Sequence, residues 1–268
     1  ISNYGFASGS LQSITYLCGL SADELINYSS SPDQAGFYSN NLLPNNSIVT
    51  STLWGEPYRY IYDANSIIEG LNGSKGISDP VKTQLLGEAY FIRSFCLFYL
   101  VNLFGSVPLI TSSDYRINDT ASRSSVGKIY RKITQDLQNA QSLMSEDYTF
   151  SGGERVRPNK YAAAALLARV YLFSEDWADA EAEASLCINN TATYSLISDL
   201  NAVFLKNSAE AIWQLQPTLP DMNTIEGSLF IMTTAPLNSS LSDQLRKSFE
   251  PGDGRRTHWI DSVQVNLE

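Results

Sequence analysis

The fold is decided by the stretch RPNKYAAAALLARVYLFSEDWADAEAEASLCINN, which runs from Arg157 to Asn190. Pro158 stands near the first turn of a predicted helix, where its missing N–H costs little. The polar residues from Ser174 to Asp176 form a short turn, and Trp177 opens a second helix. Small alanines in both segments allow the two backbones to approach closely. The stretch therefore predicts two antiparallel helices over 157–190.

The same residues match the pattern of a tetratricopeptide repeat. Leu167, Ala168 and Tyr171 fall where the first helix of such a repeat carries its apolar, small and aromatic residues, and Ala180 follows at the spacing that brings the second helix back. An ordinary helical hairpin is the alternative interpretation. The number of matched positions favours the repeat, which indicates a scaffold for recognition and not a catalytic centre.

Helical spacing extends well beyond this pair. Pro80 begins a long helix that Gly105 ends, and a further helix runs from Ser125 to Met144 after a polar loop, so we expect a second helix pair over about 80–147. Residues 52–71 also have the pattern of a helix. The segment 9–28 has near-helical spacing, with a helix expected to restart at Ser21.

Other segments are predicted to be irregular or extended. Residues 29–51 are rich in Ser, Asn and Pro and predict a long loop of the kind often used for binding. The alternation over 210–216 predicts a short strand, and residues 217–268 predict a loop-rich tail with little capacity to form a core. We thus expect one mostly α-helical domain over 1–268, with tetratricopeptide-like antiparallel helix pairs, long loops and a few short strands.

Composition excludes several classes of protein. The chain has 268 residues, a net charge of −10 and a pI of about 4.6, which argues against nucleic acid as a partner because phosphate binding needs clustered Lys and Arg. No apolar run approaches the roughly 18 residues that cross a bilayer. The chain does not begin with Met or a charged, apolar leader, so we expect a secretory peptide to be absent or already removed.

The three cysteines predict neither a metal site nor a redox motif. Cys18, Cys96 and Cys187 are far apart in apolar surroundings, with no C-x-x-C and no His at ligand spacing. We expect buried free thiols, with a single disulfide as the alternative in an exported protein.

Catalytic signatures are also missing. The chain has no G-x-S-x-G, H-E-x-x-H or phosphate-binding glycine motif, and its only histidine, His258, lies in a polar loop without an evident partner. We expect no catalytic residue, no cofactor and no enzymatic activity.

Aromatic residues on loops are the best candidates for binding. The chain carries 15 Tyr and 4 Trp, whose planes can stack on the C–H faces of sugar rings. Tyr38 in the Asn-rich loop, and Trp259 with the neighbouring Arg256, are the predicted ligand-binding residues, with packing against a core as the alternative role. Trp177 and Trp213 are predicted to be buried.

Several segments in the same order resemble the SusD/RagB family of outer-membrane glycan-binding lipoproteins. They span Ser21 to Asp261 and are Leu53-Trp54-x-x-x-Tyr58-x-x-Ile61-x-x-x-Asn65, GEAYFIRSFCLFYLV from Gly87 to Val101 with its Leu103-Phe104-Gly105-x-Val107-Pro108-Leu109 ending, Arg157-Pro158-Asn159-Lys160-Tyr161-Ala162-Ala163, Glu210-x-Ile212-Trp213-x-Leu215-Gln216 and Phe249-Glu250-x-Gly252-Asp253-x-Arg255-Arg256. Arg93 and Arg157 match motif positions, and each is expected to pair with a carboxylate or a helix-end carbonyl.

This resemblance implies a surface-exposed lipoprotein of the outer membrane. It would capture starch or another oligosaccharide or polysaccharide, without cleaving it, and deliver it to a SusC-like TonB-dependent transporter. Its lipid anchor is absent from this chain, and because family members are longer we expect an N-terminal portion. The alternatives are a protein-interaction scaffold with tetratricopeptide-like repeats, or binding of a non-glycan nutrient such as peptide; a hydrolase is a third.

Overall fold

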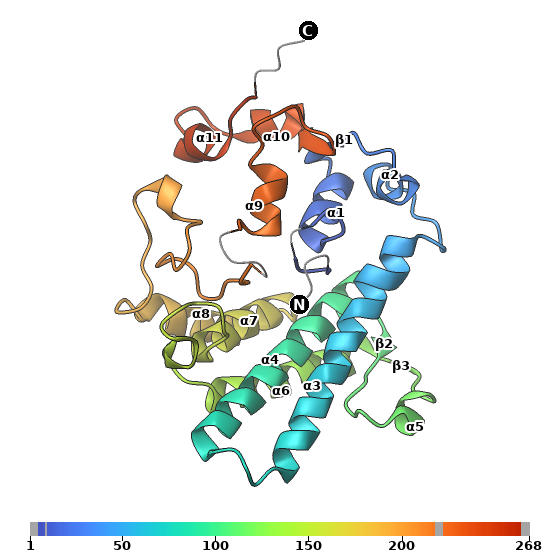
Figure 1. The fold of residues 1–268 in the computed structure, drawn as a ribbon, viewed down its shortest axis with the longest axis vertical. Coiled ribbons are helices and arrows are strands. Elements are labelled where there is room, and N and C mark those ends of the chain that lie inside the picture. Colours follow the sequence, from blue (N-terminus) through green and yellow to red (C-terminus); the bar gives the residue numbers. More distant parts are fainter. Residues whose placement is uncertain (1–4, 9, 218–221, 264–268) are drawn as a thin grey trace. The chain divides into compact units, whose positions relative to one another are not determined.

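The computed structural model describes residues 5–8, 10–217 and 222–263, which group into two compact units (Figure 1). Unit 1 comprises Ile1–Glu56, Ser198–Ala202 and Leu215–Glu268, and unit 2 comprises Pro57–Ile197 and Val203–Gln214. The described residues are mostly helical with a few short strands, which confirms the predicted fold class. That residues 1–268 form one domain stays a prediction.

Unit 2 is an array of antiparallel helices. Its elements are α3 (Glu56–Gly73), α4 (Asp79–Phe104), β2 (Val107–Pro108), α5 (Tyr115–Asn118), β3 (Arg123–Ser124), α6 (Val126–Leu143), the short 3-10 helix η2 (Thr149–Ser151), α7 (Lys160–Phe173) and α8 (Trp177–Asn189). Helix α4 packs on α6, α6 on α7, and α7 on α8. The helix pair predicted over 157–190 is therefore present, as are helices at both ends of the predicted segment 80–147.

Helix ends in unit 2 follow from local sequence. The Asn159 side chain accepts a hydrogen bond from the Ala162 N–H and caps α7, and Asp176 caps α8 in the same way through Asp179. Glu175, in the turn between them, has a φ of 61°. Gly105 ends α4 with a φ of 67°, a conformation that glycine adopts without a steric penalty.

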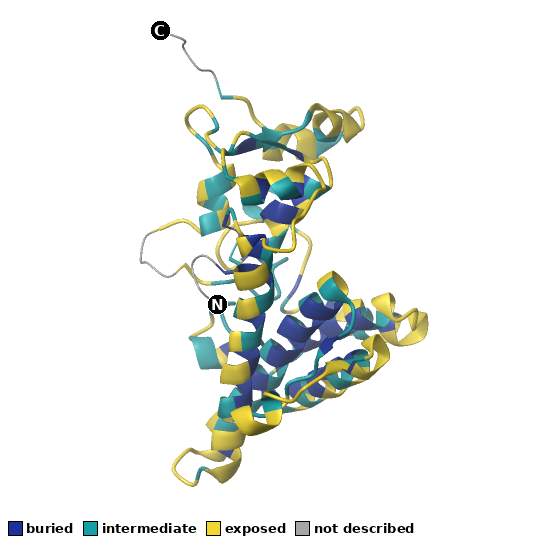
Figure 2. Cartoon of the chain, turned by 90° about the vertical axis from the view of Figure 1, so that its right-hand side faces the viewer, coloured by how far each residue is buried: buried dark blue, intermediate teal, exposed yellow. Residues whose placement is uncertain are grey.

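The core of unit 2 lies between its long helices. Most of its fully buried apolar side chains come from α4, α6 and α7, among them Leu97, Ile133 and Leu167, and Ile61 of α3 and Val107 of β2 join them. Figure 2 shows buried residues in dark blue as stripes along helices whose other sides are exposed. Such stripes are the expected outcome of apolar residues repeating every three or four positions.

A buried ion pair crosses this core. The guanidinium of Arg93 in α4 donates to both carboxylate oxygens of Asp136 in α6, at 2.8 and 2.9 Å, and Lys132 lies 2.9 Å from the same carboxylate. Arg93 also donates to Asn65 Oδ1 of α3 at 2.7 Å. Arg157 pairs with Glu88 at 2.7 Å. Both arginines thus have the carboxylate partners that the sequence predicted.

Unit 1 joins the two ends of the chain. It contains α1 (Ile14–Ser21), β1 (Leu25–Asn27), α2 (Pro32–Tyr38), the π-helix η1 (Ile48–Gly55), the 3-10 helix η3 (Leu200–Ala202), α9 (Ile225–Phe230), β4 (Ser239–Leu241), α10 (Asp243–Ser248) and α11 (Gly254–Trp259). Strands β1 and β4 pair antiparallel, with Leu25 opposite Leu241 and Asn27 opposite Ser239. The predicted loop-rich tail is therefore held to the N-terminal segment by a backbone ladder.

The structure overturns two of the local predictions in unit 1. No helix restarts at Ser21: Asp23 has a φ of 59°, α1 ends, and the chain continues as β1. The predicted loop over 29–51 contains α2, which Pro32 and Asp33 start, and the first half of η1. Proline and an acidic residue in the first turn favour a helix, and this local signal outweighs the polar composition.

Three further predictions are corrected. Residues 210–216 form no strand, because the Ala211 and Ile212 carbonyl oxygens accept from the Arg155 and Tyr148 side chains and not from a neighbouring strand. Trp177 is not buried but 61% exposed, since it starts α8 at the outer end of the α7–α8 turn. Cys18 is exposed, whereas Cys96 and Cys187 are buried free thiols as predicted.

Candidate functional site

The candidate ligand surface, called here the α11 surface, consists of Asn201, Arg256, His258 and Trp259. Helix α11 follows a tight turn in which Gly252 has a φ of 88°. The Asp253 side chain then accepts a hydrogen bond from the Arg255 N–H and caps the helix. Because α11 packs on η3, the cap sets the position of its side chains beside Asn201.

Trp259 offers an exposed aromatic ring in a fixed orientation. It is 40% exposed, and its indole N–H donates to the Leu200 carbonyl oxygen at 2.9 Å. Arg256 precedes it by one helical turn, so the two side chains leave the same side of α11. Among the described residues no carboxylate lies within ion-pair distance of Arg256. Its Nη1 donates to the Ile260 carbonyl oxygen at 3.5 Å, and the residue is exposed, so its other N–H groups can reach a ligand.

The neighbouring polar side chains are already engaged. Arg255 forms an ion pair with Asp253 at 2.6 Å, and hydrogen bonds from Arg255 hold the pKa of the Asp253 carboxyl below its usual value. His258 Nδ1 lies 3.2 Å from Asn201 Oδ1, and Asn201 Nδ2 donates to Asp199 Oδ1 at 3.1 Å. Arg255 therefore stabilises the turn, while Arg256 and Trp259 face outward.

Tyr38 lies elsewhere in unit 1. It is the last residue of α2 and 40% exposed. Figure 1 shows α2 and α11 on opposite sides of this unit. The three predicted binding residues thus divide into two places: Arg256 and Trp259 lie together on α11, and Tyr38 does not join them.

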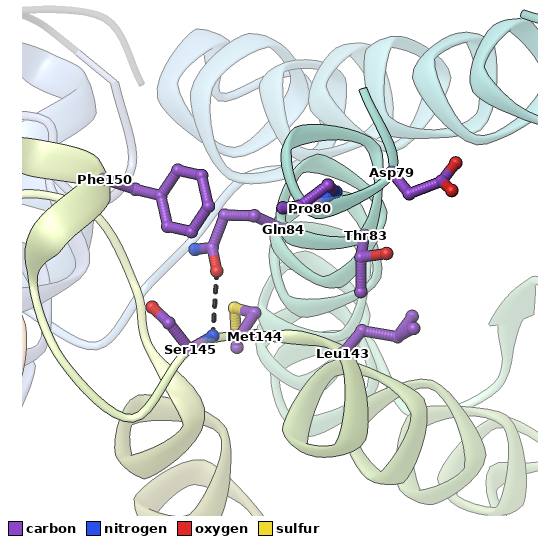
Figure 3. Close-up of a pocket in the computed structure, with 8 residues that line it drawn as sticks. All are labelled: Asp79, Pro80, Thr83, Gln84, Leu143, Met144, Ser145 and Phe150. Atoms are coloured by element: carbon purple, nitrogen blue, oxygen red, sulfur yellow. Dashed lines mark hydrogen bonds between the residues drawn. The ribbon is translucent and has the colours of Figure 1, made fainter. Parts of the chain in front are cut away.

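A cavity of about 420 Å³ in unit 2 had no signal in the sequence (Figure 3). It lies where α4 begins and α6 ends, beside η2. Its lining residues come from these three places: Asp79, Pro80, Thr83, Gln84, Leu143, Met144, Ser145 and Phe150. They are far apart in sequence and meet only through the packing of α4 on α6, so periodicity and motifs do not indicate them.

Neither a metal centre nor a membrane-spanning helix is found in the described part of the chain. Over residues 5–8, 10–217 and 222–263, no three His, Cys, Asp or Glu side chains are grouped to hold a metal ion. No helix there combines the length and the apolar composition needed to cross a bilayer.

The antiparallel helix pairs of unit 2 define a tetratricopeptide-like helical scaffold. The sequence matches the SusD-like family model described as "Starch-binding associating with outer membrane" over residues 22–172. This match covers more than half of the chain, which therefore belongs to the SusD-like family, as the sequence motifs predicted.

Individual relatives agree with this assignment. SusD-like protein P2 of Formosa agariphila is 33% identical over 184 residues, which cover 67% of this chain and 35% of the relative. The crystal structure of a SusD superfamily protein from Bacteroides thetaiotaomicron has a TM-score of 0.78 at 25% identity, covering 91% of this chain and 58% of that one. A laminarin-binding SusD-like protein has the same fold, with a TM-score of 0.78 at 21% identity and coverage of 94% and 62%.

The shares covered also show how much of each relative's length this chain spans. The chain spans about a third of the length of the curated relatives that it matches, and between half and two thirds of the solved structures. The activity, ligand and partners of a whole family member are therefore proposed for this chain and not assigned to it.

Proposed function

We propose that this protein binds a glycan without cleaving it, at the α11 surface, and delivers the glycan to a SusC-type TonB-dependent transporter at the outer membrane. It would act there as a surface-exposed lipoprotein, and starch or another oligosaccharide would be its ligand. Membership of a starch-binding family supports the ligand class, as does the laminarin-binding relative of the same fold.

The observation that carries the proposal is the pairing of Trp259 with Arg256. The hydrogen bond from the indole N–H to the Leu200 carbonyl orients the ring, and Trp259 stays 40% exposed. A sugar ring that stacks on this face can place its hydroxyl oxygens near the Arg256 guanidinium, which donates up to five hydrogen bonds. A preformed aromatic platform loses little conformational entropy on binding, and this favours affinity.

Affinity electrophoresis in gels that contain starch or laminarin tests the proposal. Trp259→Ala and Arg256→Ala should each weaken binding about tenfold or more, which corresponds to about 1.4 kcal/mol. Tyr115→Ala is the matched control, because Tyr115 is a 77% exposed aromatic residue of unit 2. Tyr38→Ala shows whether α2 carries a second contact. Unchanged migration of both α11 variants, with wild-type circular dichroism, would contradict this assignment of the site.

The absence of enzymatic activity has its own assay. The polysaccharide that binds is incubated with the protein, and new reducing ends are measured over time. We expect none above a sample without protein. Production of reducing ends that follows the protein concentration would make the protein a hydrolase.

A protein-interaction scaffold is the second candidate function. The exposed apolar side chains Leu172, Phe173 and Trp177 support it, because they gather at the turn between α7 and α8. Pull-down with the outer-membrane transporter separates the two roles. If the transporter captures the protein without any glycan, and Trp177 is required for this capture, the scaffold role is favoured. If the protein binds a peptide and none of the glycans tested, its nutrient is a peptide.

A further inference from the structure

The cavity of Figure 3 has an aromatic side and a polar side. Phe150 lies on one side, Asp79 and Thr83 lie on the other, and Gln84 lies between them. Met144 and Ser145 line it from the end of α6. A volume of about 420 Å³ falls within the range of about 300–1,000 Å³ that is usual for small-molecule sites.

The polar residues behind the cavity hold its lining in place. Gln84 is buried: its Oε1 accepts from the Ser145 N–H at 2.9 Å, and its Nε2 donates to Glu88 Oε1 at 2.8 Å. Arg157 pairs with the same Glu88 and also donates to the Phe150 carbonyl oxygen at 3.1 Å. The loop that carries Phe150 is thereby linked to α4, so the cavity is formed before any ligand arrives.

Close contact between the helices gives the cavity its floor. A Cβ atom on Gly87 of α4 would lie 2.5 Å from Met144 Cγ, so only glycine lets the end of α6 come this near. The main chain at Met144 therefore packs against α4 at Gly87, one helical turn after Thr83 and Gln84.

Two polar side chains of the lining have no partner in the described chain. The Asp79 side chain is exposed and Thr83 is half-buried, and no hydrogen bond or ion pair joins either side chain to the residues described, so both face solvent and are open to a ligand. They are four residues apart on α4 and so lie on one side of the helix. Asp79 also complements the dipole of α4, but this role does not involve Thr83.

We propose that this cavity binds one ring of a neutral sugar, as a second carbohydrate contact on unit 2 in addition to the α11 surface. The C–H face of the ring would pack on Phe150, and its hydroxyl groups would donate to Asp79 and exchange hydrogen bonds with Thr83. A uronate or sulfate group is disfavoured, because it would meet the Asp79 carboxylate. This inference rests on the proposed glycan-binding function and names the kind of glycan.

Calorimetric titration of the full chain with maltoheptaose and laminarihexaose tests the cavity. Phe150→Ala should weaken the better ligand about tenfold, and Thr83→Val, which keeps the shape and removes the hydroxyl, about fivefold. Tyr115→Ala should bind like the wild type. Phe150→Leu, which retains an apolar side chain but no ring, should lie between the wild type and Phe150→Ala. Each variant is compared only if its melting temperature matches that of the wild type.

The outcomes separate this inference from the proposed function. If the wild type binds either sugar while Phe150→Ala and Thr83→Val bind it equally well, the cavity is not a sugar site and the α11 proposal stands. If these two variants lose affinity and Trp259→Ala does not, the cavity is supported and the α11 surface is wrong. If an oligoglucuronate binds and neither neutral probe does, the cavity assignment is overturned. Binding of no sugar at all overturns both.

Discussion

Replacing Asp136 with alanine is expected to lower the free energy of unfolding by about 3–5 kcal/mol, because it leaves a buried cation without its counter-charge. The Arg93 side chain is 4% exposed and the Asp136 side chain 0%. In Asp136→Ala, Arg93 loses two charge-assisted hydrogen bonds and Lys132 loses one ion pair. The hydrogen bond from Arg93 to Asn65 and the stacking of its guanidinium on the Tyr90 ring remain. Arg93→Ala should cost a similar amount by leaving the carboxylate buried.

The double variant Arg93→Met with Asp136→Leu isolates the cause. Replacing both charges by apolar side chains of similar size removes the desolvation penalty together with the attraction, so the pair is often neutral to replace. Asn65 Oδ1 would lose its donor, at a cost of about 1–3 kcal/mol. We therefore expect the free energy of unfolding of the double variant to lie within about 3 kcal/mol of the wild-type value. If the losses of the two single variants were additive, it would fall by about 6–10 kcal/mol.

Urea unfolding followed by far-UV circular dichroism measures these free energies, with the slope of the transition compared between variants. Arg116→Ala together with Asp114→Ala is the control, since that ion pair is exposed and should contribute little to the free energy of unfolding. A loss below about 1 kcal/mol for Asp136→Ala, or additive losses in the double variant, would refute the reasoning that a buried charge pair couples α4 to α6.

Three other changes test the packing of unit 2 and the state of the thiols. Gly87→Ala should lower the melting temperature. The new methyl group would overpack against Met144 at a cost of about 1–3 kcal/mol, which exceeds the gain of about 1 kcal/mol from the higher helix propensity of alanine. A higher melting temperature would show that the two helices can separate at no cost. Asn159→Ala should cost about 2 kcal/mol in urea, because it removes the cap of α7 and the hydrogen bond to Tyr194, and a loss below about 0.5 kcal/mol would contradict the cap. With an aromatic disulfide reagent at about pH 8, Cys18 should react faster than the other two thiols, and Cys18→Ser should abolish this faster phase. Cys96 and Cys187 are buried, and burial raises the pKa of Cys187 to about 11; desolvation also raises the pKa of Cys18, but its thiol is exposed to the reagent. Three equally fast thiols would contradict the burial.

Part of the candidate site could be read from the chain itself. Arg256 and Trp259 are three residues apart, so any helix brings them together, and the Gly252-Asp253 pair predicts the turn that precedes it. Tyr38 was placed in a loop by composition, but α2 carries it to a different side of unit 1. Whether a residue joins a distant surface depends on the path of the chain, which no local pattern contains.

The sequence by itself determined the helices of unit 2, because the signals that start, repeat and stop a helix lie within a few residues of one another. The Asn159 cap, the apolar spacing along α4 and the stop at Gly105 are of this kind. Only the tertiary structure decided that Asp136 is the partner of Arg93, that β4 pairs with β1, and that α4, α6 and η2 line an open cavity. These contacts join residues remote in sequence, and their selection depends on packing and burial, which become definite only when the chain has folded.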